Sequence, residues 1–279
     1  MSGFSVDWLS LREPVDHRSV NADVRAAFMR DFGARDHVTL TDIGCGSGSH
    51  LRSLAPHLGP RQTWRLVDYD ARLLAAAREL LCRWADRAED TSAGVRLEKN
   101  ARIIETSFVQ CDLSKDLDTI LDEPADAVTA AAFFDLVSER FIETFIVALT
   151  ARKLPLYTIL TYDGREVWSP PHRADAAMLA AFNAHQSTDK GFGAAAGPNA
   201  TALMSEAFRR KGYIVATGES PWRLSVKDRL LMSELASGIA HAVGETGRVA
   251  ADDVASWLAD KKTAVHCEIG HLDLYARAN

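Results

Sequence analysis

The stretch from Val38 to His50 reads Val-Thr-Leu-Thr-Asp-Ile-Gly-Cys-Gly-Ser-Gly-Ser-His. A β-branched, apolar run breaks abruptly into Gly44, Gly46 and Gly48, and residues that favour a helix follow. This order predicts a strand, a tight loop and a helix, which is the start of a βαβ unit. Alternate glycines leave bare backbone that a ligand can approach closely. The loop departs from the GxGxxG dinucleotide fingerprint, because Ser49 stands where the third glycine would be.

Acidic residues follow the next two predicted strands. Asp68 and Tyr69 end a strand that begins at Trp64, and Asp112 and Leu113 follow a third strand at residues 103–111. A carboxylate at the end of the second strand can accept hydrogen bonds from both hydroxyls of a ribose. Each of these acids can instead cap the helix behind it, which is the role that we expect of Asp70.

Composition restricts the class of protein. The chain has 279 residues, 47% of them hydrophobic and 25% charged, as in a globular protein. The net charge of −6 argues against binding to a nucleic-acid backbone. We expect no secretory leader, because Met1–Ser10 has neither a basic region nor a long apolar core. We expect no membrane span, because the sequence contains no apolar run of about 18 residues. Four scattered cysteines without ligand spacing indicate reduced thiols and a cytoplasmic protein.

The rest of the pattern predicts one domain, residues 1–279. Residues 1–36 form a helical N-terminal cap, 37–162 a cofactor-binding half, and 163–279 a substrate-side half with a helical insertion at 227–262. Further strands are expected at residues 125–134, 154–161, 213–217 and 266–275. The two inserted helices can either form a homodimer surface or cover the sheet.

Taken in order, the glycine loop and the two acidic strand ends resemble class I S-adenosylmethionine-dependent methyltransferases over about Thr39 to Phe134. The resemblance implies an α/β fold with a doubly wound, seven-stranded, mostly parallel sheet, its last strand inserted beside the sixth. It also implies S-adenosylmethionine as cofactor. In that family the loop faces the methionine part, the first acid holds the ribose and the second holds adenine. These roles fall here on the residues Asp42, Gly44, Cys45, Gly46, Gly48, Asp68, Tyr69, Asp112, Leu113 and Ala131, with Asp42 expected to fix the amides of the loop.

The fourth predicted strand bears on the acceptor. Enzymes of the family that act on base amines resemble Asn/Asp-Pro-Pro-Tyr/Phe there, whereas this chain reads Ala131-Ala132-Phe133-Phe134. Metal-dependent members place a carboxylate at the Ala131 position, where this chain has none. These departures favour a small-molecule acceptor and a reaction without a metal.

Two residues are candidates for a general base, which an amine or phenol acceptor requires. Asp135 follows the fourth strand, and His185 lies near the start of a polar, glycine-rich stretch, Asn183–Gly193, that can serve as a lid. The candidates for contact with the substrate are Arg12, Phe134, Tyr162, Asn183 and Gln186. Packing within a helix face is the competing role for each of them.

Three other functions fit parts of the pattern. A catalytically silent S-adenosylmethionine-binding regulator or scaffold would keep the nucleoside site and lack turnover. A protein or RNA methyltransferase would share the cofactor, although the acidic balance disfavours RNA. A nicotinamide-linked oxidoreductase is disfavoured by Gly48 and Asp112.

Overall fold

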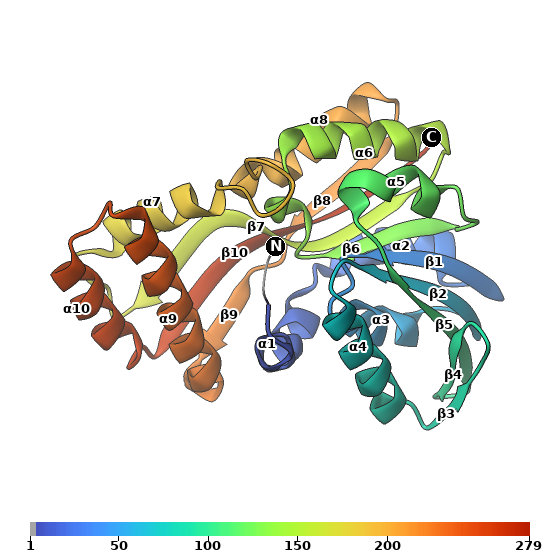
Figure 1. Ribbon diagram of the computed structural model, residues 1–279, viewed down its shortest axis with the longest axis horizontal. Helices are drawn as coiled ribbons and strands as arrows, with labels where there is room; N and C mark the ends of the chain where they lie inside the picture. Colours follow the sequence, from blue (N-terminus) through green and yellow to red (C-terminus); the bar gives the residue numbers. More distant parts are fainter. Residues whose placement is uncertain (1–3) are drawn as a thin grey trace.

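A computed structural model describes residues 4–279, which are organised around one ten-stranded sheet (Figure 1). The strands are β1 (His37–Ile43), β2 (Arg61–Asp68), β3 (Arg87–Asp90), β4 (Gly94–Lys99), β5 (Arg102–Gln110), β6 (Ala127–Ala131), β7 (Leu156–Ser169), β8 (Ile214–Glu219), β9 (Trp222–Ser225) and β10 (His266–Arg277). They lie in the order β3-β4-β5-β2-β1-β6-β7-β10-β8, and β9 pairs with β10.

Helices connect and cover these strands. The α-helices are α1 (Val6–Ser19), α2 (Ala22–Phe32), α3 (Ser49–Leu54), α4 (Ala71–Trp84), α5 (Leu113–Leu121), α6 (Glu139–Ala151), α7 (Asp175–Gln186), α8 (Ala200–Arg210), α9 (Arg229–Thr246) and α10 (Ala251–Lys261). Short 3-10 turns are η1 (Ala55–His57), η2 (Phe134–Leu136), η3 (Gly197–Asn199) and η4 (Val226–Asp228). None of the helices within residues 4–279 has the length and apolar character needed to cross a membrane.

The centre of the sheet is parallel, and its C-terminal edge is not. Strands β5, β2, β1, β6 and β7 run parallel, while β10 lies antiparallel between β7 and β8. The predicted insertion of the last strand beside the sixth is therefore confirmed, as is the doubly wound α/β class. Buried residues along both faces of β6 explain why its sequence is small and apolar throughout.

The expected number of seven strands was too low. The additional strands are the β3–β4 hairpin, which extends the sheet beyond β5, and β9, which pairs with the end of β10. All four residues of β3 are exposed, so this strand lacks the alternation of buried and polar positions that marks a strand in sequence. β4 does alternate, with Val95 and Leu97 buried on either side of Arg96, and the prediction missed it. β9 is only four residues long and gives too short a pattern.

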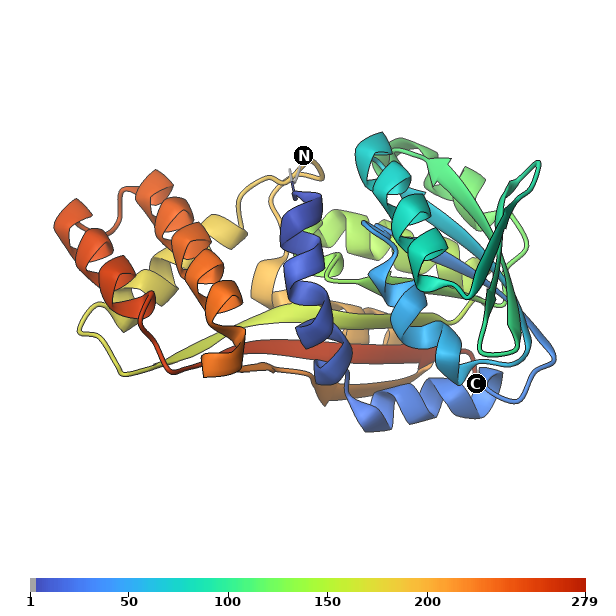
Figure 2. The same cartoon turned by 90° about the horizontal axis from the view of Figure 1, so that it is seen from below.

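Two hydrophobic clusters cover the two faces of the sheet. Helices α2, α3 and α4 contribute to one cluster, and α5, α6 and α8 form the other. At one end of the molecule, α7, α9 and α10 gather beside the extended ends of β7 and β10 (Figure 1). Helix α1 stands between that group and α3–α4 (Figure 2), in contact with α3 and β9. The helical N-terminal cap and the helical insertion are thus confirmed.

A buried carboxylate ties the cap to the strands below the site. Asp273 on β10 is fully buried and accepts hydrogen bonds from the backbone amides of Leu160 (2.8 Å) and Asn21 (2.7 Å) and from the Ser220 hydroxyl. Leu160 has a φ of +57°, a conformation that is strained for a branched side chain. The carboxylate therefore holds a strained turn of β7 in place.

We expect Asp273→Ala to lower the free energy of unfolding by about 3 kcal/mol, because three buried donors lose their acceptor. Urea unfolding followed by circular dichroism measures this. Asp252→Ala, an exposed acid at the start of α10, is the control and should change stability by no more than about 0.5 kcal/mol. A loss for Asp273→Ala as small as that of the control would show that the carboxylate does not hold the turn.

Candidate functional site

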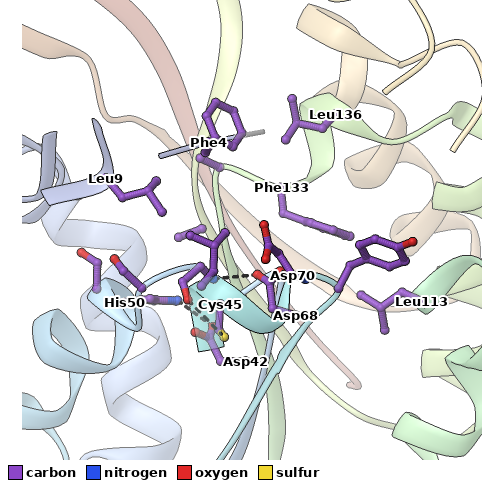
Figure 3. Close-up of a pocket in the computed structure, with 18 of the residues that line it drawn as sticks. Phe4, Leu9, Asp42, Cys45, His50, Asp68, Asp70, Leu113, Phe133 and Leu136 are labelled. Carbon is purple, nitrogen blue, oxygen red and sulfur yellow. Dashed lines mark hydrogen bonds and ion pairs between the residues drawn. The ribbon is translucent and has the colours of Figure 1, made fainter. Parts of the chain in front are cut away.

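A cavity of about 730 Å³ opens at the carboxyl ends of β1, β2, β5 and β6. This is the edge where open α/β sheets bind ligands. Figure 3 shows its lining side chains: Asp68 and Asp70 lie at the centre, His50 and Asp42 on one side, and Leu113 on the other. Phe4 and Leu136 lie at the opposite end of the same cavity.

The glycine loop forms the floor of the cavity with bare backbone. Gly44 and Gly46 have φ values of +61° and +53°, which favour glycine. A Cβ on Gly44 would lie 2.5 Å from the Phe133 ring. Gly48 lies outside the lining: its α-carbon faces Ala77 and Leu81 of α4, and its φ of +74° lets it start α3. It shapes the loop without facing the cavity.

Asp68 connects two strand ends. Its Oδ2 accepts the backbone N–H of Gly46 at 2.8 Å, and its Oδ1 accepts that of Asp70 at 2.9 Å. A carboxylate has about four acceptor sites, so lone pairs remain for a ligand. Burial raises the pKa of Asp68, partly offset by these backbone hydrogen bonds. Next to it, Tyr69 is 51% exposed and presents a free aromatic face at the cavity.

Asp112 lines the cavity and also caps α5. Its carboxylate accepts hydrogen bonds from the Ser114 backbone and hydroxyl and from the Lys115 ammonium at 2.7 Å. The bond from Lys115 is the main cause that lowers the pKa of Asp112. The adjacent Leu113 supplies apolar lining. Asp70 caps α4 as expected, through the Arg72 amide.

Asp42 is buried and pairs away from the loop. Its Oδ1 accepts hydrogen bonds from His50 Nδ1 (3.2 Å) and Thr129 Oγ1 (2.7 Å). The expectation that Asp42 fixes the amides of the loop was wrong, because Asp68 binds the Gly46 amide instead. Asp42 Oδ2 and His50 Nε2 are buried without a partner among residues 4–279, and both residues line the cavity.

Most predicted cofactor residues meet at this cavity. Those in its lining are Asp42, Gly44, Cys45, Gly46, Asp68, Tyr69, Asp112, Leu113 and Ala131, and the predicted substrate residue Arg12 joins them from α1. Arg12 donates to Asp16 at 2.8 and 3.2 Å, and Asp16 also accepts from Trp222 Nε1.

Phe134 and Asp135 lie outside the lining, and their neighbours Phe133 and Leu136 take the expected place. The fourth strand ends at Ala131, three residues earlier than predicted, because Ala132 adopts a φ of +50°. A 3-10 turn follows and directs Phe134 into the core, where it is fully buried.

The other predicted contacts also lie away from the lining. Tyr162 donates a hydrogen bond to Asn183 Oδ1 at 2.9 Å, and Asn183 Nδ2 donates to the Gly164 carbonyl. His185 pairs with Glu245 at 2.9 Å. Gln186 ends α7 outside the cavity. These side chains join β7 and α9 to α7 behind the wall of the site.

Several lining residues had not been singled out from the sequence: Phe4, Leu9, His50, Phe133, Lys190 and Phe192. Lys190 and Phe192 belong to the polar, glycine-rich stretch expected to serve as a lid, so composition located the segment without identifying its residues. Across the part of the chain that the structure describes, no three acidic, histidine or cysteine side chains converge as a metal site.

Asp135 is a buried acid behind the cavity. Burial raises its pKa to about 6, and its Oδ1 has no hydrogen-bond partner within the described residues. In the unfolded chain the pKa is near 3.8. Between these values the folded state binds a proton that the unfolded state has lost. Stability from this group is therefore complete below about pH 4 and is lost as the pH rises through 6.

We expect Asp135→Asn to remove the decrease in stability that accompanies ionisation of this group. Between pH 4 and pH 7 the unfolding free energy of the wild type should fall by about 2 to 3 kcal/mol relative to that of the variant. Urea unfolding at a series of pH values measures it. Parallel stability curves for the two proteins would contradict the burial of a titrating carboxyl group here.

Comparison with solved structures places the fold. No protein-family model matches this sequence, and no curated protein matches it significantly. A cyclopropane-fatty-acyl-phospholipid synthase-like protein from Lactobacillus casei aligns with 98% of this chain and 94% of its own, with 14% identity and a TM-score of 0.52. The cyclopropane synthase MmaA2 from Mycobacterium tuberculosis aligns over 98% and 94%, with 15% identity and a TM-score of 0.48. The first likeness shows that the chain has the same α/β fold as that protein.

Proposed function

We propose that this chain is an S-adenosylmethionine-dependent methyltransferase that acts on a small molecule without a metal. The observation that carries the proposal is the meeting of three neighbouring strand ends, those of β1, β2 and β5, at one cavity. They contribute the Gly44–Gly46 backbone, the Asp68 carboxylate and the Asp112–Leu113 turn. Each suits a different part of one nucleoside-containing ligand.

The residues present fit that cofactor. Asp68 keeps free lone pairs for ribose hydroxyls although it also holds the loop. Tyr69 and Leu113 offer an exposed ring and an apolar surface on which a purine can stack. Asp42 Oδ2 and His50 Nε2, both buried without a partner among the described residues, suit the polar methionine end. Asp112 fits less completely, because Ser114 and Lys115 already engage its carboxylate.

When bound, the cofactor supplies a methyl group that its positive sulfur already activates for in-line displacement. The chain's own residues then need to align the acceptor and exclude water, and alignment is worth several kcal/mol. Leu9 of α1 and Phe192 of the stretch after α7 line the cavity together with the strand ends. A cavity of about 730 Å³ supports a small acceptor over a protein or RNA chain. Four free cysteines support a reducing, cytoplasmic location.

A second function has specific support. Both residues nominated as general bases, Asp135 and His185, lie outside the cavity lining. A protein that binds the cofactor for regulation or as a scaffold would need neither. The two functions differ in turnover and agree in cofactor binding.

Cofactor binding is tested by calorimetric titration with S-adenosylhomocysteine. We expect Asp68→Ala to weaken binding at least about tenfold, because hydrogen bonds to a charged acceptor are lost. Asp68→Asn keeps an acceptor for the Gly46 amide and separates loop support from ligand contact. The exposed Asp252→Ala is the matched control and should bind like wild type. Failure of the wild-type protein to bind would overturn the proposed cofactor.

Turnover separates the two functions. Incubation of the protein with S-adenosylmethionine carrying a tritiated methyl group and a metabolite extract should yield a labelled small molecule. Asp68→Ala should reduce the label about tenfold or more at low cofactor concentration. Cofactor binding without any labelled product would favour the regulatory or scaffold function.

A further inference from the structure

The stretch after α7, residues 187–196, forms a structured wall of the cavity. Asp189 Oδ1 accepts the backbone amides of Gly191 (2.7 Å) and Gly193 (3.0 Å), which closes a tight turn. Phe192 packs edge-on against Phe141, with ring centroids 4.7 Å apart, and against Phe133 at 5.9 Å. The turn is therefore anchored on the same Phe133 ring that contacts Gly44, and it presents Lys190 to the cavity.

Two neighbours direct the Lys190 ammonium. Its Nζ donates to Thr188 Oγ1 at 2.9 Å and lies 3.5 Å from His185 Nδ1. An ammonium group can only donate, so Nδ1 accepts, and the proton of His185 is on Nε2, where it is donated to Glu245 at 2.9 Å. An ammonium group has three N–H donors. Two are directed to the protein, and one remains for a ligand.

No protein carboxylate neutralises this charge at close range. Within residues 4–279, no Asp or Glu oxygen lies within 4.0 Å of Lys190 Nζ, and Glu245 is engaged by His185 and His241. Arg12 and Arg72, the arginines of the lining, are paired with Asp16 and Asp70. Among the lysine and arginine side chains of the lining, Lys190 is thus the one without a carboxylate partner within 4.0 Å in residues 4–279, and partial burial lowers its pKa.

The lining that contains this cation also has apolar side chains. Phe192 follows Lys190 by two residues in the same turn and packs against Phe133, and Phe4, Leu9 and Leu136 also line the cavity. Figure 3 shows Phe4 and Leu136 at the end of the cavity away from Asp42 and His50. A ligand here would place an apolar body among these side chains and an anionic group on the ammonium.

We propose that the acceptor is an organic anion whose carboxylate or phosphate group is held by Lys190 while its apolar body packs against Phe133 and Phe192. This inference rests on the proposed methyltransferase function. Two other roles of Lys190 give different results in the test: binding the carboxylate of the cofactor, and acting as the general base.

The experiment uses three variants of the full chain. Lys190→Met removes the charge, Lys190→Arg keeps it, and Lys262→Met makes the same change at the exposed residue that follows α10. Binding of S-adenosylhomocysteine and of methylthioadenosine, which lacks the amino-acid part, is measured for each. A metabolite extract, separated by anion exchange into anionic and non-anionic fractions, is then incubated with tritiated S-adenosylmethionine.

We expect label in the anionic fraction, reduced about tenfold to a hundredfold by Lys190→Met, and largely kept by Lys190→Arg and Lys262→Met. Binding of S-adenosylhomocysteine should stay unchanged in all three variants. Phosphatase treatment of the fraction before incubation abolishes the label if the anionic group is a phosphate monoester and leaves it if the group is a carboxylate.

Other outcomes overturn the inference. Label confined to the non-anionic fraction excludes an anionic acceptor. Weaker binding of S-adenosylhomocysteine to Lys190→Met, with methylthioadenosine unaffected, assigns Lys190 to the cofactor. Loss of turnover in Lys190→Arg as in Lys190→Met indicates a general base. If the wild type binds no S-adenosylhomocysteine, or labels nothing in either fraction, the proposed function itself fails.

Discussion

The hydrogen bond from the Gly46 amide to the Asp68 carboxylate joins the loop after β1 to the end of β2. Because these strands are parallel neighbours, their carboxyl ends meet at one edge, and the bond fixes the loop where the strands end. A second bond, from the Asp70 amide, fixes the chain that leads into α4. One partly buried carboxylate thus shapes both sides of the cavity floor and still has lone pairs for a ligand.

Strained backbone shapes the opposite wall. Ala132 follows β6 and has a φ of +50°. Leu160 lies in β7, just after the part that pairs with β6, and has a φ of +57°. Both residues line the cavity. Such conformations persist where surrounding contacts hold them. Asp273 does so at Leu160, and its bond to the Asn21 amide extends the same support to the helical cap. This wall of the cavity therefore depends on β10, the last strand of the chain.

The two ends of the cavity differ in chemistry. Asp68, Asp70 and Asp112 gather at the end that suits a nucleoside, while Arg12 and Lys190 reach the cavity from α1 and from the wall at residues 187–196. Pairing with Asp16 compensates the charge of Arg12, whereas the neighbours of the Lys190 ammonium are Thr188 and His185. That difference supports an anionic acceptor and gives His185 a place behind the lysine, outside the cavity.

The sequence by itself determined the central parallel strands, the bare loop, and the acids at two strand ends, because periodicity and glycine spacing are local properties. It also located the glycine-rich stretch that becomes a wall. Only the tertiary structure decided which residues beyond the loop reach the cavity. Because Ala132 adopts a left-handed conformation, Phe133 lines the cavity in place of Phe134. His185 on α7 lies outside the lining, whereas Lys190 in the turn that follows α7 is part of it. Such choices depend on contacts between distant segments, such as Phe192 on Phe141, which no local pattern encodes.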